Sequence, residues 1–165
     1  MKRIKRLVAA GKRKVEELSE KDCFELALLI DTEGSIDTCH QNRPHIKVGM
    51  SSTLPVKIYT NWDRGTIYKE KKRGKKLFYD WNVDKQSQIR EILEKIKPHL
   101  QIKQQQAKLA LQMLNILDNK KEGYKEKLKQ IAVEIHRLNR TEPPDYDWIP
   151  YPTKRSVECG KTVTP

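Results

Sequence analysis

Two carboxylates stand at the end of the most apolar segment of the chain. Residues 23–30 are apolar at nearly every position, and Asp31, Glu33 and Gly34 follow them closely. Glycine is common just past the end of a helix, so the pattern predicts a helix that stops at Gly34. Acids are normally disfavoured at a helix C-terminus, because the last carbonyl groups already make that end negative. A bound cation would reverse this, and carboxylate, water and phosphate oxygens are ligands that suit Mg²⁺.

The rest of this helix is expected to be buried. Ser19 followed by Asp22 resembles a capping box, which predicts that the helix starts after Ser19. Apolar residues lie nearly all round the helix, and a helix of that kind must be buried on more than one side. The alternative interpretation is a buried helix with an ordinary acidic end and no chemistry.

The segment Leu26–Gly34 resembles the LAGLIDADG motif of the homing endonucleases. It matches the nine-letter pattern at six positions, and Glu33 conservatively replaces the second acid. A second segment, residues 100–107, is similar to a run of leucine, lysine, glutamine and alanine that follows the third main helix of that family. The resemblance covers about residues 19–117.

The resemblance implies a site-specific endonuclease that hydrolyses phosphodiesters of double-stranded DNA with divalent metal. Glu33 would bind the metal with the Gly34 carbonyl nearby, and Asp31 would shape the helix end more than bind metal. Lys103, which matches a lysine of the second segment, would offset charge on the phosphate or tune the attacking water. The implied catalytic set is Glu33, Lys103 and Asp31, with Mg²⁺ as cofactor and Ca²⁺ as a non-catalytic substitute.

A single motif implies that two chains pair through the helix 20–33, so that each contributes one acidic helix end. A two-fold dimer predicts a long, nearly palindromic target. One departure from the motif is Leu28, which stands where the family has a glycine that lets two helices pack closely. Ala27 beside it is small, so close packing remains possible.

The remaining elements are predicted from periodicity and turn residues. Strands are expected over 35–41, 45–51, 66–71 and 75–83, with a turn at 42–44. Further helices are expected from Thr53 to about Asp63, after a cap at Asp84, over 103–117 and over 124–138. The result is an α+β, αββαββα fold whose helices pack on one face of an antiparallel, saddle-like sheet. A basic arm is expected over 1–18, the endonuclease domain over 19–140 and a proline- and aromatic-rich tail over 141–165.

Strand alternation predicts which side chains lie on the free face of this sheet, and that face is expected to enter the major groove. The predicted DNA-binding residues are Ser35, Asp37, Cys39, Gln41, His45, Lys47, Ser51, Thr66, Tyr68, Glu70, Lys72, Arg73, Lys76, Asp80 and Asn82. Each could equally be a plain solvated residue. Phe78 would also face outward, where it would touch a thymine methyl group or pack on the hairpin.

Composition agrees with a nucleic-acid partner. The chain carries 34 basic and 22 acidic residues, a net charge of +12, which implies an anionic partner. The three cysteines and four histidines show no metal-ligand or disulfide spacing, so neither a zinc site nor another metal cluster is expected from them. No membrane segment and no small-molecule cofactor are expected, and the protein is predicted to be intracellular.

Two other functions stay open from the sequence. The first is a non-cleaving nucleic-acid-binding protein of the same fold, either an intron maturase or a transcription regulator. The second is an unrelated basic protein, for instance one bound to ribosomal RNA. The presence of Asp31, Glu33 and Lys103 favours the enzyme, because a protein that only binds needs none of them.

Overall fold

A computed structural model describes residues 2–3, 18–39, 42–71 and 77–140 of the chain. The strands are β1 (Lys2–Arg3), β2 (Gly34–Cys39), β3 (Arg43–Met50), β4 (Thr66–Lys71) and β5 (Leu77–Val83). The helices are α1 (Glu20–Glu33), α2 (Leu54–Trp62), α3 (Gln86–Ile96), the short 3₁₀ helix η2 (Lys97–His99), α4 (Gln104–Asn119) and α5 (Tyr124–Asn139). No helix among the described residues is long and apolar enough to cross a membrane.

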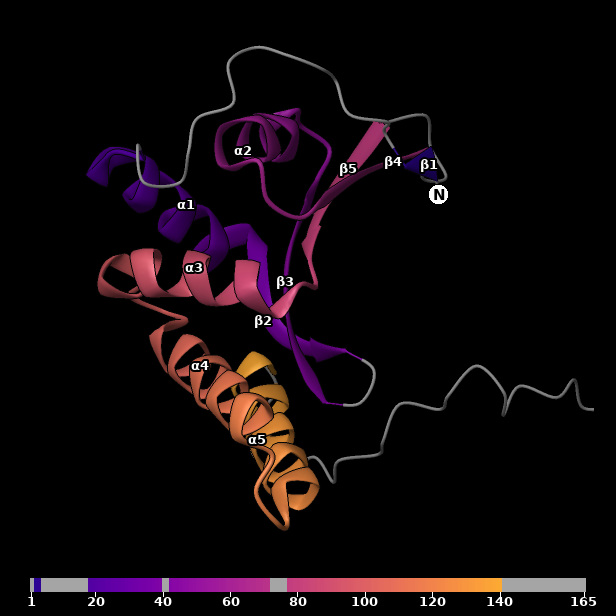
Figure 1. Ribbon diagram of the computed structural model, residues 1–165. Coiled ribbons are helices and arrows are strands. Elements are labelled where there is room, and N and C mark those ends of the chain that lie inside the picture. Colours follow the sequence, from indigo (N-terminus) through magenta and orange to yellow (C-terminus); the bar gives the residue numbers. More distant parts are fainter. Residues whose placement is uncertain (1, 4–17, 40–41, 72–76, 141–165) are drawn as a thin grey trace, which may run out of the picture.

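The strands form one antiparallel sheet in the order β1-β4-β5-β3-β2. Helices α1 to α5 lie on one side of it, and the described part of the chain leaves the other side open (Figure 1). The predicted αββαββα arrangement of α+β class is therefore confirmed.

Strand β1 was not predicted. The backbone at Lys2 pairs with Lys69 and that at Arg3 with Tyr68, so these two residues extend the sheet. A strand of two residues carries no alternation that a sequence pattern could reveal. The rest of the predicted arm, apart from Leu18, and the predicted tail over 141–165 lie outside the described residues.

Alternation along the strands decides which face is buried. Ile36, Ile46, Val48, Trp81 and Val83 are fully buried beneath the helices. The predicted apolar stripe of α3 joins the same core through its isoleucines and leucine. Each residue between them points to the open face, because successive side chains of a strand project to opposite sides.

Helix α1 begins and ends as its sequence predicts. Ser19 and Asp22 form the expected capping box, with the Asp22 amide donating to Ser19 Oγ at 3.2 Å. At the other end the chain passes directly from helix into β2 at Gly34. A Cβ atom on Gly34 would lie 2.8 Å from the Ile30 Cα and 3.1 Å from the Lys47 carbonyl oxygen, so only glycine allows this close approach.

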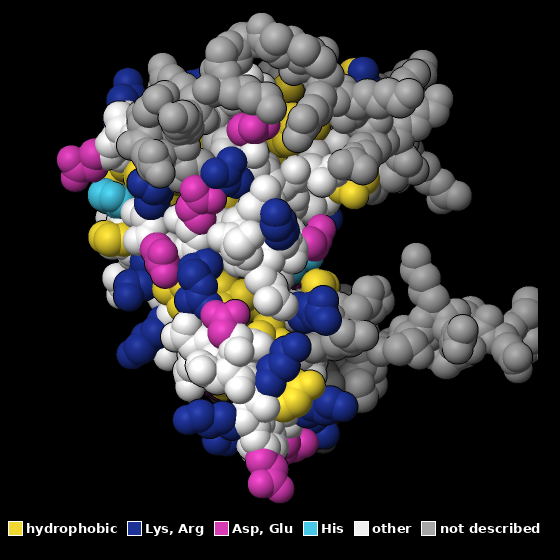
Figure 2. Space-filling model, viewed as in Figure 1, with side chains coloured by type: hydrophobic (Ala, Val, Ile, Leu, Met, Phe, Trp, Pro, Cys, Tyr) yellow, Lys and Arg dark blue, Asp and Glu magenta, His cyan; other side chains and the backbone are white. Residues whose placement is uncertain are grey.

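Helices α4 and α5 form a second apolar cluster that extends the helical layer. Asn139 of α5 donates from Nδ2 to the Ile36 carbonyl oxygen at 2.8 Å, which ties α5 to the edge strand β2. The outer surface of these two helices carries basic side chains mixed with acidic ones (Figure 2). This surface therefore does not form a patch of one charge in that view.

Two predicted boundaries are wrong. Asp84 does not cap α3, because Lys85 occupies the N-cap position and no side-chain capping bond forms. Asp84 instead places a carboxylate oxygen 3.0 Å from His45 Nδ1. Strand β3 begins at Arg43 rather than His45, with Pro44 opposite Thr38, so that most of the expected turn is strand.

Candidate active site and nucleic-acid face

Asp31 is the buried acid of the motif, with 7% of its surface exposed. Its Oδ2 accepts hydrogen bonds from the backbone amides of Gln101 at 2.7 Å and Ile102 at 3.2 Å, and its Oδ1 accepts one from the Lys103 amide at 2.8 Å. These amides precede α4, where a negative charge is favoured by the helix dipole. Asp31 therefore joins the two segments that resemble the family motifs.

Lys103 lies at this junction. Its Nζ donates a hydrogen bond to the Asp31 carbonyl oxygen at 2.5 Å. Burial lowers the pKa of the Lys103 ammonium group, and the charge of Asp31 opposes this shift. The contact holds a partly buried cation against the last turn of α1, within two residues of Glu33.

Glu33 differs from Asp31 in exposure and in hydrogen bonding. It is the last residue of α1 and is exposed. Within the described part of the chain, its carboxylate has no hydrogen bond or ion pair. An exposed carboxylate at a helix C-terminus, where carbonyl groups gather, is a donor set that fits a hard divalent cation.

The predicted alternation on the open face is confirmed. Residues directly opposite one another in neighbouring antiparallel strands project to the same side. The pairs on this side are Ser35–Lys47, Asp37–His45, Lys47–Asn82, Gly49–Asp80, Thr66–Asn82 and Tyr68–Asp80, while the predicted role of the Glu70 side chain lies outside what the structure describes. Cys39 lies on the same face, and Ser51 follows the end of β3. Gln41, Lys72, Arg73 and Lys76 lie outside the described residues.

Two polar residues of this face are covered rather than solvated. Asp80 is 5% and Asn82 is 9% exposed, and among the described residues Oδ1 of each lacks a hydrogen-bond partner. Lys47 Nζ lies 3.4 Å from Asp80 Oδ1, close enough for an ion pair. Buried polar atoms normally have hydrogen-bond partners, so Asn82 Oδ1 is unusual, whereas Asp80 Oδ1 has Lys47 as its ion-pair partner.

Gly49 explains how Asp80 and Phe78 come to lie on the sheet. A Cβ atom at Gly49 would be 2.3 Å from Asp80 Oδ1 and 3.0 Å from Phe78 Cε1. Both side chains therefore lean over the bare backbone of β3. Phe78 therefore lies over Gly49 of the neighbouring strand.

Cys39, His45 and Asp84 also come together on the open face, with their potential ligand atoms all within 4.8 Å of one another. Sequence spacing had predicted no cluster of cysteines and histidines, and this proximity was therefore not anticipated. The three residues come from neighbouring strands, so their spacing along the sequence does not predict that they meet. Burial, and after it the Asp84 carboxylate, raises the pKa of the Cys39 thiol.

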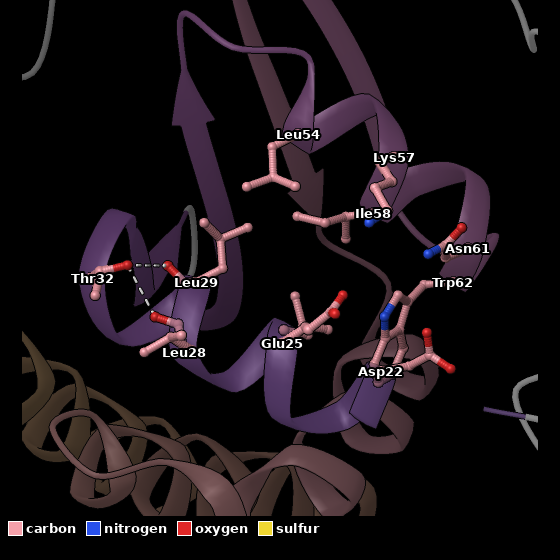
Figure 3. A pocket seen from close by; sticks show the side chains of 11 residues that line it. Asp22, Glu25, Leu28, Leu29, Thr32, Leu54, Lys57, Ile58, Asn61 and Trp62 are labelled. Atoms are coloured by element: carbon pink, nitrogen blue, oxygen red, sulfur yellow. Dashed lines mark hydrogen bonds between the residues drawn. The ribbon is translucent and has the colours of Figure 1, made fainter. Parts of the chain in front are cut away.

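One side of α1 leaves large apolar side chains exposed, namely Phe24 at 49% and Leu28 at 53%. Beside Leu28 a hollow of about 460 Å³ opens between α1 and α2 (Figure 3). Leu28, Leu29, Leu54, Ile58 and Trp62 supply its apolar lining. Ala27 is fully buried within its own chain, so the expectation that it could serve close packing of two helices is wrong.

No protein-family model and no curated protein matches the chain significantly. Solved structures do match. The homing endonuclease I-CvuI, in complex with its target in the presence of calcium, has a TM-score of 0.62 at 23% identity over 74% of this chain and 85% of its own. The archaeal intron-encoded endonuclease I-Vdi141I, complexed with DNA, gives 0.64 at 14% identity over 78% and 90%. The homing endonuclease I-TnaI gives 0.58 at 15% identity over 73% and 93%.

The chain therefore has the fold of the LAGLIDADG homing endonucleases, and the likeness covers most of its length. The resemblance inferred from residues 26–34 and 100–107 is confirmed at the level of the fold. At these identities the neighbours do not assign a role to any single residue of this chain.

Proposed function

We propose that this protein is a metal-dependent endonuclease that cuts double-stranded DNA as a homodimer. The observation that carries the proposal is the junction of α1 with α4. There the Asp31 carboxylate accepts hydrogen bonds from backbone amides, and Lys103 Nζ donates a hydrogen bond to the Asp31 carbonyl oxygen. The Glu33 side chain at the same helix end remains exposed. A fold that only bound DNA would need the Asp31 contact but not an exposed carboxylate beside a partly buried lysine.

The open face of the sheet would lie in the major groove, which admits a two-stranded β-ribbon or a sheet. I-CvuI and I-Vdi141I, which share the fold, have both been solved in complex with DNA. Lys47 and Thr66 provide donors on this face, while Asp80, which pairs with Lys47, and Asn82 provide acceptors. Such a mixed set suits base edges better than phosphates, which only accept hydrogen bonds from a protein.

Glu33 and the backbone at Gly34 would hold the divalent cation, Mg²⁺ in the first instance. When bound, the cation would supply Lewis-acid stabilisation and an activated water. I-CvuI has been crystallised on DNA with calcium and with magnesium, which supports a site of this class. Lys103 would place its positive charge beside the phosphate, and Asp31 would keep Lys103 and α1 in register.

The homodimer follows from the number of sites and from the exposed side of α1. One chain offers one Glu33, whereas cutting both strands of a duplex needs two such sites. A two-fold axis along α1 would supply the second site and would cover Phe24 and Leu28, which are half exposed in the single chain. The target would then be nearly palindromic.

The decisive test compares two isosteric variants in a cleavage assay on a pool of randomised duplex DNA. The native chain should enrich and cut a discrete site with Mg²⁺ and should only bind it with Ca²⁺. Glu33→Gln should lower the cutting rate by about 100-fold or more while changing DNA affinity by less than about threefold. Glu94→Gln, an exposed glutamate on α3, is the matched control and should cut normally.

Two outcomes would contradict the proposal. Full activity in Glu33→Gln would remove Glu33 from the reaction. Tight, site-specific binding by the native chain without cutting in Mg²⁺ would instead identify a non-cleaving DNA-binding protein of this fold.

A further inference from the structure

The group formed by Cys39, His45 and Asp84 lies at the far end of β2 from Glu33. Cys39 is the last residue of β2, His45 lies on β3 and Asp84 follows β5. β3 pairs with β2 on one side and with β5 on the other, so the three side chains converge from adjacent strands. His45 lies opposite Asp37, so the group is about 10 to 17 Å along β2 from Gly34, and the two places cannot share one cation.

The spacing of the ligand atoms already suits a bound cation. His45 Nδ1 is 3.0 Å from Asp84 Oδ1, and all three potential ligand atoms lie within 4.8 Å of one another. Two ligands on one tetrahedral ion at usual bond lengths are roughly 3 to 3.5 Å apart. Closing the group around an ion therefore requires small side-chain rotations and no backbone change.

His45 supplies an independent observation. Its Nε2 is buried and has no hydrogen-bond partner among the described residues, while its Nδ1 faces Asp84. A buried ring nitrogen without a partner is unusual. Nδ1 is therefore the ring nitrogen that one ion could share with Asp84 Oδ1, and Nε2 makes no hydrogen bond that would hold the ring in another orientation.

We propose that Cys39, His45 and Asp84 bind a borderline-soft divalent cation of the zinc class. Thiolate and imidazole donors select such ions and bind Mg²⁺ poorly, so the site differs in chemistry from the one proposed at Glu33. Three protein ligands leave a fourth position for water. The ion would join the ends of β2, β3 and β5 at one edge of the open face, and it does not depend on whether the protein cuts DNA.

The test uses the full chain, freed of metal and without DNA, titrated with Co²⁺ and then with Zn²⁺. One Co²⁺ per chain should bind and give a thiolate-to-cobalt charge-transfer absorption, which stoichiometric Zn²⁺ should abolish. Cys39→Ser should lose this absorption. Asp84→Asn and His45→Gln should weaken Zn²⁺ binding, measured by calorimetry, by about 10- to 100-fold or more.

The chain offers matched controls. Cys23→Ala, Cys159→Ser and Glu33→Gln should all keep the charge-transfer absorption, and circular dichroism of the metal-free Cys39→Ser variant should match that of the native chain. Persistence of the absorption in a folded Cys39→Ser variant would overturn the proposal, as would a native chain that binds no zinc ion at one per chain. Neither result would alter the cleavage assay, which tests Glu33 separately.

Discussion

Two acids of the motif, separated by one residue, have opposite environments. Residues i and i+2 of a helix do not face the same way, so Asp31 points to the segment before α4 while Glu33 points to solvent. Asp31 is satisfied by three backbone amides, and each of these bonds to a charged group is stronger than a neutral one. The first acid therefore builds the junction, and the second is free for chemistry.

Replacing Asp31 should mainly affect stability. Asp31→Asn places an NH₂ group against a backbone amide and should lower the free energy of unfolding by about 2–4 kcal/mol. Glu33→Gln, at an exposed position of the same helix end, should change it by less than about 0.5 kcal/mol. Urea unfolding followed by circular dichroism measures both. Equal effects of the two substitutions would show that Asp31 does not hold the junction.

Sequence reasoning identified both acids and Lys103 but not their contact. The motif resemblance marked the two segments, and the acid at position 31 was expected to shape the helix end. The bonds between them join residues about 70 positions apart, and no local periodicity reports such a distance. The burial of Asp80 and Asn82 was missed for a related reason, because alternation predicts direction and not burial.

At the scale of elements, α1 carries more apolar surface than the single chain buries. Apolar residues all round it predicted burial on more than one side, and the single chain covers only part of the helix. Phe24 and Leu28 remain exposed one turn apart, next to the hollow between α1 and α2. A second copy of α1 is the occupant that the proposed function requires there.

A charge at Leu28 should therefore prevent dimer formation. Leu28→Glu would bury an unpaired carboxylate in the interface, which should weaken self-association by about 30-fold or more. Val133→Glu on α5 introduces the same charge at a position of similar exposure and should leave the dimer intact. Sedimentation equilibrium of the native chain and both variants provides the measurement. A native chain that stays monomeric at high concentration would contradict the dimer.

Strands and helices were predicted well where they were long and regular. Strand β4 matches the prediction, and α1 ends at the expected glycine. The errors fall on short or locally ambiguous pieces. Strand β1 has only two residues, and the Asp84 carboxylate is used by His45 on a neighbouring strand rather than by the adjacent helix. At Asp84 a tertiary contact replaced the capping role that the local sequence predicted.

For the whole molecule, the net charge of +12 should dominate the salt dependence of DNA binding. If the dimer neutralises 6–10 phosphates, its affinity should fall by about 10³- to 10⁵-fold between 50 and 200 mM salt. Fluorescence anisotropy with a labelled duplex would measure the slope. Lys125→Gln, on the outer helical layer, should leave that slope unchanged. A weak dependence on salt would argue against a phosphate-contacting surface.

The order of elements and the fold class could be predicted from the sequence, whereas the meeting of residues far apart in the sequence could not. The order of elements and the two faces of the sheet follow from period and turn residues. The meeting of Cys39, His45 and Asp84 does not, because it requires the strand order β5-β3-β2 and the register between those strands. Close spacing along the sequence cannot reveal potential metal ligands that come from different strands.

The overlap of Asp80 with the space above Gly49 matters for anyone who wishes to retarget this protein. Any side chain introduced at position 49 must displace Asp80 or Phe78, because their atoms occupy the space where its Cβ would lie. A library that varies position 49 alone would thus change the positions of Asp80 and Phe78 together with the new side chain. Positions 49, 78 and 80 form a single unit of variation and need to be randomised together.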